Sequence, residues 1–188
     1  MQNLEELKKQ VEKCKKCKLC SNEAIKVFGK GNEHAEIMIV GEAPGEKEEI
    51  EGIPFFGRAG ENLNKYLKEA GFNIEKDIYF CNVLKCRTTD ENKIKKDRRP
   101  QKDEIKNCRT FLEQQIEIIN PKVIILCGVT AMKFFKIAEL LKNIHGKEIT
   151  KNGRKIYPVY HPVARVKDET KINDLKNIIR KIKEQNEQ

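Results

Sequence analysis

Residues 36–45 read Glu-Ile-Met-Ile-Val-Gly-Glu-Ala-Pro-Gly, and they are the clearest indication of the fold class in the chain. A short apolar run that ends at a glycine is typical of a buried strand followed by a tight loop. The run Val123–Cys127 has the same character and predicts another buried strand. Strands of this kind are typical of a parallel sheet that is covered by helices on both faces. The fold is therefore expected to be of the α/β class.

Helical and extended patterns alternate along the rest of the chain. Two further strands are predicted at residues 78–84 and 155–160, the second paired locally across the Asn152-Gly153 turn. Apolar residues at helical spacing predict helices over residues 2–13, 60–70, 103–119 and 130–141, and another from residue 169 onward. This alternation predicts one domain over residues 1–188, a three-layer α/β/α sandwich around a central, mainly parallel four-stranded sheet.

The composition excludes several classes of protein. The 188 residues are 38% hydrophobic and 36% charged, which rules out a collagen, a membrane bundle and a wholly disordered chain. No apolar run approaches the roughly 20 residues that cross a bilayer, and the first residues show no export-signal pattern. We therefore expect a cytoplasmic protein that does not bind membranes.

The charge balance points to an acidic partner. The formal net charge is +9, and residues 85–109 and 151–188 each carry ten basic and five acidic side chains. Clustered basic residues are typical of nucleic-acid binding, although a solvated basic surface explains the charge alone equally well. The charge alone therefore does not establish nucleic-acid binding, which needs a supporting sequence motif.

Unusual residues follow three of the four expected strands. Gly41-Glu42-Ala43-Pro44-Gly45 follows the first strand, Asn82 ends the second, and His161 follows the last. Because ligands bind at the carboxyl ends of strands in open α/β sheets, these segments should bring a carboxylate, an amide and an imidazole to one rim. The glycine loop lacks both the Gly-Lys-Ser/Thr ending and the Gly-x-Gly-x-x-Gly spacing, which weakens the alternative of a nucleotide-binding regulator.

The cysteines favour a metal centre over disulfides. Seven cysteines are present, an odd number, at positions 14, 17, 20, 81, 86, 108 and 127. Without an export signal the thiols are expected to stay reduced, and Cys14-x-x-Cys17 is typical of a pair that binds one metal centre. Four thiolates suit either zinc or a [4Fe–4S] cluster, and the spacing does not choose between them. Cys81 and Cys127 lie within expected strands and are interpreted as small core residues.

Together these motifs resemble the family 4 uracil-DNA glycosylases, the iron–sulfur members of the uracil-DNA glycosylase superfamily. The resemblance runs from Cys14 to about Arg165, with the motifs in the order of the family. The motifs are Gly41-Glu42-Ala43-Pro44-Gly45 with Glu48-Glu49, Pro54-Phe55-Phe56-Gly57-Arg58-Ala59-Gly60, Asn82-Val83-Leu84-Lys85-Cys86-Arg87 and His161-Pro162.

The resemblance implies a monofunctional DNA glycosylase, a hydrolase that begins base-excision repair of deaminated cytosine. It would flip deoxyuridine out of single- or double-stranded DNA and hydrolyse the N-glycosidic bond, leaving uracil and an abasic site. By the family pattern, Phe55 would stack on uracil, Asn82 would pair with its N3–H and O4 edge, and His161 would hydrogen-bond O2 and stabilise the leaving anion. The backbone of Glu42, Ala43 and Pro44 would line the pocket.

The group that activates water is left open. Other branches of the superfamily have an aspartate where this chain has Ala43, so the task must fall to another residue or be dispensable. Glu42 and Glu48 are the candidates.

The resemblance also implies a [4Fe–4S] cluster held by Cys14, Cys17, Cys86 and Cys108, with zinc as the alternative metal and Cys20 as the rival ligand. Twenty-one residues separate Cys86 from Cys108, which is longer than usual in the family. The polar stretch 88–99 within this gap is interpreted as an inserted surface loop. The cluster is expected to pin residues 88–106, whose Lys and Arg side chains would face phosphates.

Three further expectations concern partners and alternatives. Residues 163–165, after His161-Pro162, occupy the place of the family's loop that wedges into the duplex. A monomer acting on the prokaryotic nucleoid is expected, and no segment convincingly matches a sliding-clamp peptide. The alternatives are an enzyme with broader specificity that also removes hypoxanthine, and a non-catalytic nucleic-acid binder stapled by a metal.

Overall fold

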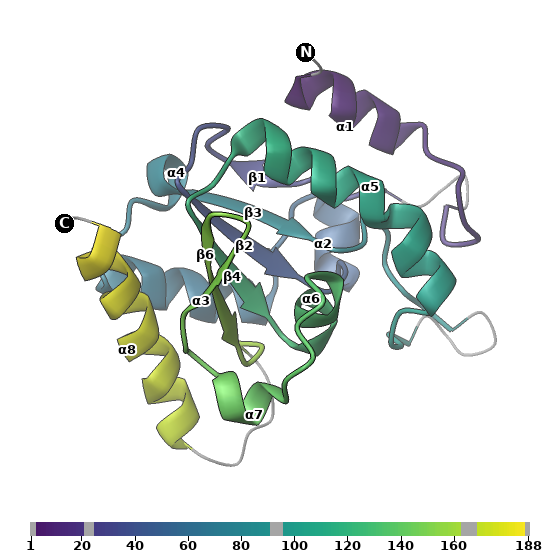
Figure 1. Cartoon of the computed structure of the whole chain (residues 1–188). Helices are drawn as coiled ribbons and strands as arrows, with labels where there is room; N and C mark the ends of the chain where they lie inside the picture. The colour runs from purple at the N-terminus through teal and green to yellow at the C-terminus, as the bar shows by residue number, and fades with distance from the viewer. Residues whose placement is uncertain (1–2, 21–24, 91–95, 163–168, 187–188) are drawn as a thin grey trace.

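A computed structural model describes residues 3–20, 25–90, 96–162 and 169–186 of the chain. Its strands form one sheet in the order β1-β3-β2-β4-β6-β5 (Figure 1). The strands are β1 (Lys30–Gly31), β2 (Ile37–Gly41), β3 (Ile78–Asn82), β4 (Val123–Cys127), β5 (Ile149–Lys151) and β6 (Arg154–Val159). The inner strands β3, β2, β4 and β6 are parallel, and the two edge strands are antiparallel to their neighbours.

The four strands expected from the sequence are the four inner strands of this sheet, so the mainly parallel α/β fold is confirmed. The expected number of four is corrected to six, because short strands β1 and β5 extend the sheet at its edges. β5 pairs with β6 across the Asn152-Gly153 turn, in which both residues have positive φ angles of 51° and 74°. β5 is therefore the local partner that the sequence analysis predicted across this turn, whereas the two residues of β1 carry too little pattern to be read from sequence.

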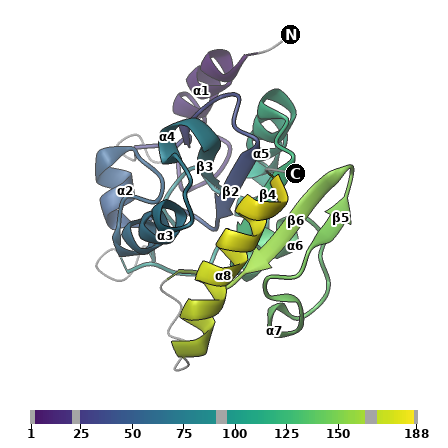
Figure 2. The same cartoon turned by 90° about the vertical axis from the view of Figure 1, so that its left-hand side faces the viewer.

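Helices cover both faces of the sheet and complete the three layers. Along β2, Met38 and Val40 point to one core, and Ile37 and Ile39 point to the other. The first core is closed by α1 (Leu4–Glu12), α5 (Lys102–Ile119), α6 (Val129–Phe134) and α7 (Leu141–Ile144). The second is closed by α3 (Arg58–Glu69) and α8 (Glu169–Asn186), which lie beside each other in Figure 2. This arrangement is the expected α/β/α sandwich.

Two helical regions differ from expectation. The helix expected over residues 130–141 ends at Phe134, because Lys136 takes a left-handed conformation with φ 54°, and α7 forms separately. Two short helices that lack apolar periodicity were not expected, namely α2 (Glu46–Glu51) and α4 (Ile74–Asp77). Among the described residues no helix combines the length and the apolar character needed to span a membrane.

The start of α3 packs directly on the backbone of Phe55. A Cβ atom built on Gly60 would lie 1.6 Å from the Phe55 carbonyl oxygen, so no side chain fits at this position. Phe55 itself has a positive φ of 56°, which an ordinary residue adopts only when its surroundings hold it there. Gly60 therefore fixes the place of Phe55.

We expect Gly60→Ala to lower the free energy of unfolding by about 1–3 kcal/mol, because the added methyl group must displace the Phe55 backbone. Gly57→Ala is the matched control, since nothing lies within 4 Å of a Cβ built there, and its cost should stay below about 1 kcal/mol. Urea unfolding of both variants measures the difference. Equal stability of the two variants would contradict this account of Gly60.

Candidate active site

The loops that follow β2 and β3 lie side by side at the carboxyl end of the sheet. Gly41 is the register partner of Asn82 at the end of the parallel ladder. Beyond it, the Val83 N–H donates to the Gly41 carbonyl and the Leu84 N–H donates to the Glu42 carbonyl, both at 3.0 Å. The two predicted segments are thereby joined along one rim, as expected.

Asn82 and Phe55 face each other across Gly41. A Cβ on Gly41 would lie 2.2 Å from Asn82 Oδ1 and 3.1 Å from Phe55 Cζ, so both side chains close over this glycine. The Phe55 ring packs against Phe80 at a centroid distance of 5.4 Å, whereas the neighbouring Phe56 is exposed. The predicted amide and aromatic ring therefore lie beside the same glycine, and we call the place where Gly41, Phe55 and Asn82 meet the slot.

The Asn82 amide nitrogen has no partner in the described structure. Asn82 is only 3% exposed, and its Nδ2 is buried without a hydrogen bond to any described residue. A buried donor without an acceptor costs free energy, so such a group usually awaits a ligand or an ordered water. The slot therefore presents an unused hydrogen-bond donor beside an aromatic ring.

Glu48 holds the walls of this slot together. Its Oε2 accepts a hydrogen bond from the Gly45 N–H at 2.7 Å, and the backbone N–H groups of Phe55 and Phe56 also favour its charged form. Burial raises the pKa of Glu48, and these N–H groups oppose the rise. Of the two candidate carboxylates, Glu48 is the one committed to the backbone.

Glu42 is held by a residue that the sequence analysis missed. The Thr130 hydroxyl, at the start of α6, donates a short hydrogen bond to Glu42 Oε2. The charge of Glu42 also acts on His161, whose pKa burial lowers and Glu42 raises, with burial prevailing. Thr130 follows β4, the inner strand at whose carboxyl end the sequence analysis identified no motif. Its position just after Gly128, at the same rim, could have indicated it as a site residue.

The remaining predicted pocket residues differ in position. In the loop after β2, Pro44 is buried, and Ala43 is half-buried and packs on the core shared by α5 and α6. Residues 163–165, expected to form a wedge, lie outside the described residues.

Five cysteine side chains line a separate cavity. Cys14, Cys17 and Cys20 come from the turn after α1, Cys86 from the segment after β3, and Cys108 from α5. The Cys20 Sγ lies 3.8 Å from that of Cys17 and 3.9 Å from those of Cys14 and Cys86. The four predicted ligands are therefore gathered at one place, with the rival Cys20 among them. Within the described ranges, no three metal-binding side chains already surround a single ion position.

Burial and hydrogen bonding tune these thiols differently. Burial raises the pKa of Cys86 and Cys108, and it raises that of Cys17 to about 11. Burial also acts on Cys20, but hydrogen bonds from the Cys17 backbone and from neighbouring thiols bring its pKa below the ordinary value. The Lys85 N–H adds a hydrogen bond to Cys108 Sγ at 3.4 Å. An all-sulfur donor set with backbone N–H support suits an iron–sulfur centre.

A buried lysine connects this cavity with the slot. Lys85 is 1% exposed, and its Nζ donates to the Asn82 carbonyl at 2.7 Å and to Gln115 Oε1 at 2.6 Å. Burial lowers the pKa of Lys85, while negative charge on Cys81 and Cys108 raises it. Gln115, which sequence reasoning missed, carries the contact on to Tyr79. Hydrogen bonds of Lys85 therefore connect Asn82 in the slot with Cys108 in the cysteine cavity.

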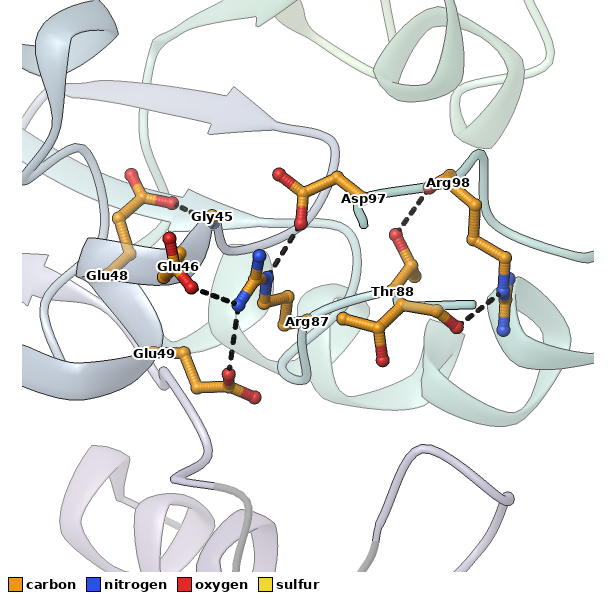
Figure 3. A network of polar contacts seen from close by, with 9 residues as sticks. Gly45, Glu46, Glu48, Glu49, Arg87, Thr88, Asp97 and Arg98 are labelled. Carbon is orange, nitrogen blue, oxygen red and sulfur yellow. Dashed lines mark hydrogen bonds and ion pairs between the residues drawn. The ribbon is translucent and has the colours of Figure 1, made fainter. Parts of the chain in front are cut away.

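Part of the basic charge expected to face phosphates is paired inside the protein. The Arg87 side chain is 5% exposed and contacts Asp97 and two carboxylates of α2, as Figure 3 shows. Arg98 forms an ion pair with the buried Glu104. Lys96 and Arg99 are the exposed basic residues of the described part of the insertion. Arg98, one of the basic residues expected to face phosphates, therefore has an internal carboxylate partner.

Comparison with known proteins identifies close relatives of the chain. Residues 28–183 match the family model described as the uracil DNA glycosylase superfamily. A type-4 uracil-DNA glycosylase of Thermotoga maritima is 39% identical over 180 residues, covering 94% of this chain and 88% of the relative. One from Saccharolobus solfataricus is 39% identical over 98% of this chain and 87% of its own length. One from Archaeoglobus fulgidus is 37% identical over 87% of this chain and 83% of its own length.

The Glu42→Gln substitution is expected to lower the pKa of His161 further, because it removes the negative charge that opposes burial. Histidine ring signals followed by NMR from pH 4 to about pH 8 measure the change. The wild-type value should lie below 6.5, and a His161→Gln variant assigns the signal. An unchanged or higher pKa in Glu42→Gln would show that Glu42 does not act on His161.

Proposed function

The chain belongs to the uracil-DNA glycosylase superfamily, and we infer that it is a uracil-DNA glycosylase that hydrolyses the bond between uracil and deoxyribose in DNA. The products are free uracil and an abasic site. We propose that it acts as a monomer on the DNA of the cell, where its activity begins the repair of deaminated cytosine.

The unused donor of Asn82 carries the assignment of the base slot. Its amide offers one acceptor, Oδ1, and one donor, Nδ2, which complement the N3–H and O4 of uracil. Cytosine presents the reverse pattern, an acceptor at N3 and a donor at N4, and would leave both contacts unmade. The ring of Phe55 would stack on the flipped base, a contact typically worth about 1–3 kcal/mol per base. The slot is therefore selective for uracil.

His161 is proposed to stabilise the departing base. Because its pKa lies below the ordinary value, the imidazole is neutral at pH 7 and can donate an N–H to uracil O2. The C1′–N1 bond breaks with its electron pair leaving on uracil, and negative charge gathers on O2, where this donor would stabilise it. Solvent then protonates the uracil anion.

Of the two candidate carboxylates, Glu42 is better suited than Glu48 to activate the attacking water. Glu48 is occupied by the Gly45 N–H and faces the backbone N–H groups of Phe55 and Phe56, whereas Glu42 is oriented by Thr130 and lies within electrostatic reach of His161. Its carboxylate would accept a proton from the water that bonds to C1′ and would offset positive charge that develops on the sugar. Glu48 instead keeps the slot in shape.

We propose that Cys14, Cys17, Cys86 and Cys108 hold a [4Fe–4S] cluster. The all-thiol donor set, gathered from three segments in one cavity, supports this proposal. Such a cluster would supply a covalent cross-link between the turn after α1, the segment after Asn82 and helix α5. The chemistry on the base is carried by the chain's own residues.

The first test is uracil release from a single-stranded oligonucleotide that contains one deoxyuridine. The wild type should turn over repeatedly, and Asn82→Ala and His161→Ala should each lose about a hundredfold or more in rate. Asn143→Ala and His34→Ala, which remove the same groups at exposed positions, should keep the wild-type rate.

Two outcomes would replace this function. Equal cleavage of a hypoxanthine oligonucleotide would assign the broader specificity, and DNA binding without any cleavage would assign a non-catalytic binder. A duplex substrate with uracil opposite guanine, run in parallel, establishes whether double-stranded DNA is also a substrate.

Serine variants of the five cavity cysteines test the cluster and its ligands. Iron and acid-labile sulfide should fall sharply in the Cys14, Cys17, Cys86 and Cys108 variants and remain in Cys20→Ser. If Cys20→Ser loses its iron and one of the other four variants keeps it, Cys20 replaces that other cysteine as the fourth ligand. Zinc without sulfide in the wild type would assign the alternative metal.

A further inference from the structure

Gly45, at the end of the loop after β2, caps helix α2, but the helix has few side chains of its own that hold it in place. The helix has only six residues, none of them buried, and its one apolar side chain, Ile50, is 65% exposed. A helix this short is not stable without tertiary contacts. It nevertheless carries Glu48, which fastens Gly45 and Phe55. Polar contacts must therefore fix α2 in place.

Arg87 supplies those contacts from inside the protein. Its Nη1 lies 3.4 Å from Glu46 Oε1 and 3.6 Å from Glu49 Oε2, so it binds successive parts of α2. Its Nε donates to Asp97 Oδ1 at 2.6 Å (Figure 3). Arg87 is shielded from water, with 5% of its side chain exposed, whereas Glu46 and Asp97 are 63% and 61% exposed. The ion pair with Glu49, which is 22% exposed, is therefore the least screened of the three.

Asp97 brings the insertion into this network. Thr89 and Asp97 form an antiparallel bridge, and the Thr88 hydroxyl donates to the Arg98 carbonyl at 2.7 Å. On the other side, Arg98 pairs with Glu104 in the first turn of α5, a carboxylate that is fully buried. The ends of the insertion are thereby fixed to α5 through Arg98 and to α2 through Asp97 and Arg87.

We propose that residues 88–90 and 96–99 of the insertion brace the base slot, with Asp97 and Arg87 as positioning residues. They hold α2, and α2 holds Phe55 through Glu48, so that the slot is formed before DNA arrives. The inference rests on the proposed function for its effect on uracil, but not for its effect on α2. Preorganisation of this kind favours the reaction because less ordering is needed when substrate binds.

The charge of Asp97 makes the proposal testable against a direct role in DNA binding. Replacing Asp97 by asparagine makes the protein more positive, which by itself would strengthen DNA binding and raise kcat/KM. A brace predicts the opposite, because Arg87 loses the carboxylate that lies 2.6 Å from its Nε and α2 loosens. The two accounts therefore differ in the direction of the change.

The experiment compares Asp97→Asn with Glu51→Gln, a matched loss of one carboxylate on α2 for which the described structure gives no ion pair. In Asp97→Asn, hydrogen exchange of the amides of residues 45–56 should accelerate about tenfold, and kcat/KM for uracil release should fall by about tenfold. Glu51→Gln makes the same change in charge without removing an ion pair of the described structure, so it should leave the exchange rates unchanged and should not lower kcat/KM. The iron content should stay at the wild-type level in both variants.

Glu49→Gln removes the α2 end of the same contact and should show the same local acceleration, which keeps the test open if Asp97→Asn does not fold. Unchanged exchange in residues 45–56, or a rise in kcat/KM, would overturn the brace. A loss of salt dependence in Lys96→Gln together with unchanged exchange in Asp97→Asn would instead assign the insertion to phosphate contacts. If the wild type releases no uracil, the proposed function fails while the exchange measurement still decides on the brace.

Discussion

The base slot depends on the close approach of Gly41 and Asn82 at the last rung of the β2–β3 ladder. The absent Cβ leaves room for Asn82 Oδ1 and for the Phe55 ring, which would otherwise be forced apart. Gly60 imposes a second condition of the same kind, because it lets the backbone of Phe55 lie against α3. Two positions without side chains therefore set the distance between the amide and the aromatic ring.

The short segment after Asn82 joins three parts of the molecule. Lys85 connects the Asn82 backbone to Gln115 and the cysteine cavity, and Arg87 connects the same segment to α2 and the insertion. Cys86 lies between them in sequence and faces the cavity. Buried cations keep their partners firmly because an unpaired charge in the interior is costly. Disturbance of the cysteines or of the insertion should therefore reach the slot through this segment.

The inner sheet could be predicted because its strands carry their own evidence. Residues 37–40 and Val123–Cys127 are apolar on both faces, which is what a strand covered by two helical layers requires. Edge strands β1 and β5 have no such requirement, since they are short and partly exposed. The early end of α6 could not be read either, because a left-handed Lys136 is not encoded by any apolar pattern.

For the site, the sequence alone determined which groups are available and that they share one rim: Asn82 and His161 follow parallel strands, and the carboxyl ends of such strands converge. The hydrogen-bond partners of the two carboxylates, Glu42 and Glu48, depend instead on tertiary packing. Glu48 is committed to nearby backbone N–H groups, whereas Glu42 is held by Thr130, 88 residues away in the chain. A contact between residues so far apart leaves no local pattern, because it arises from the packing of separate strands and loops into one rim.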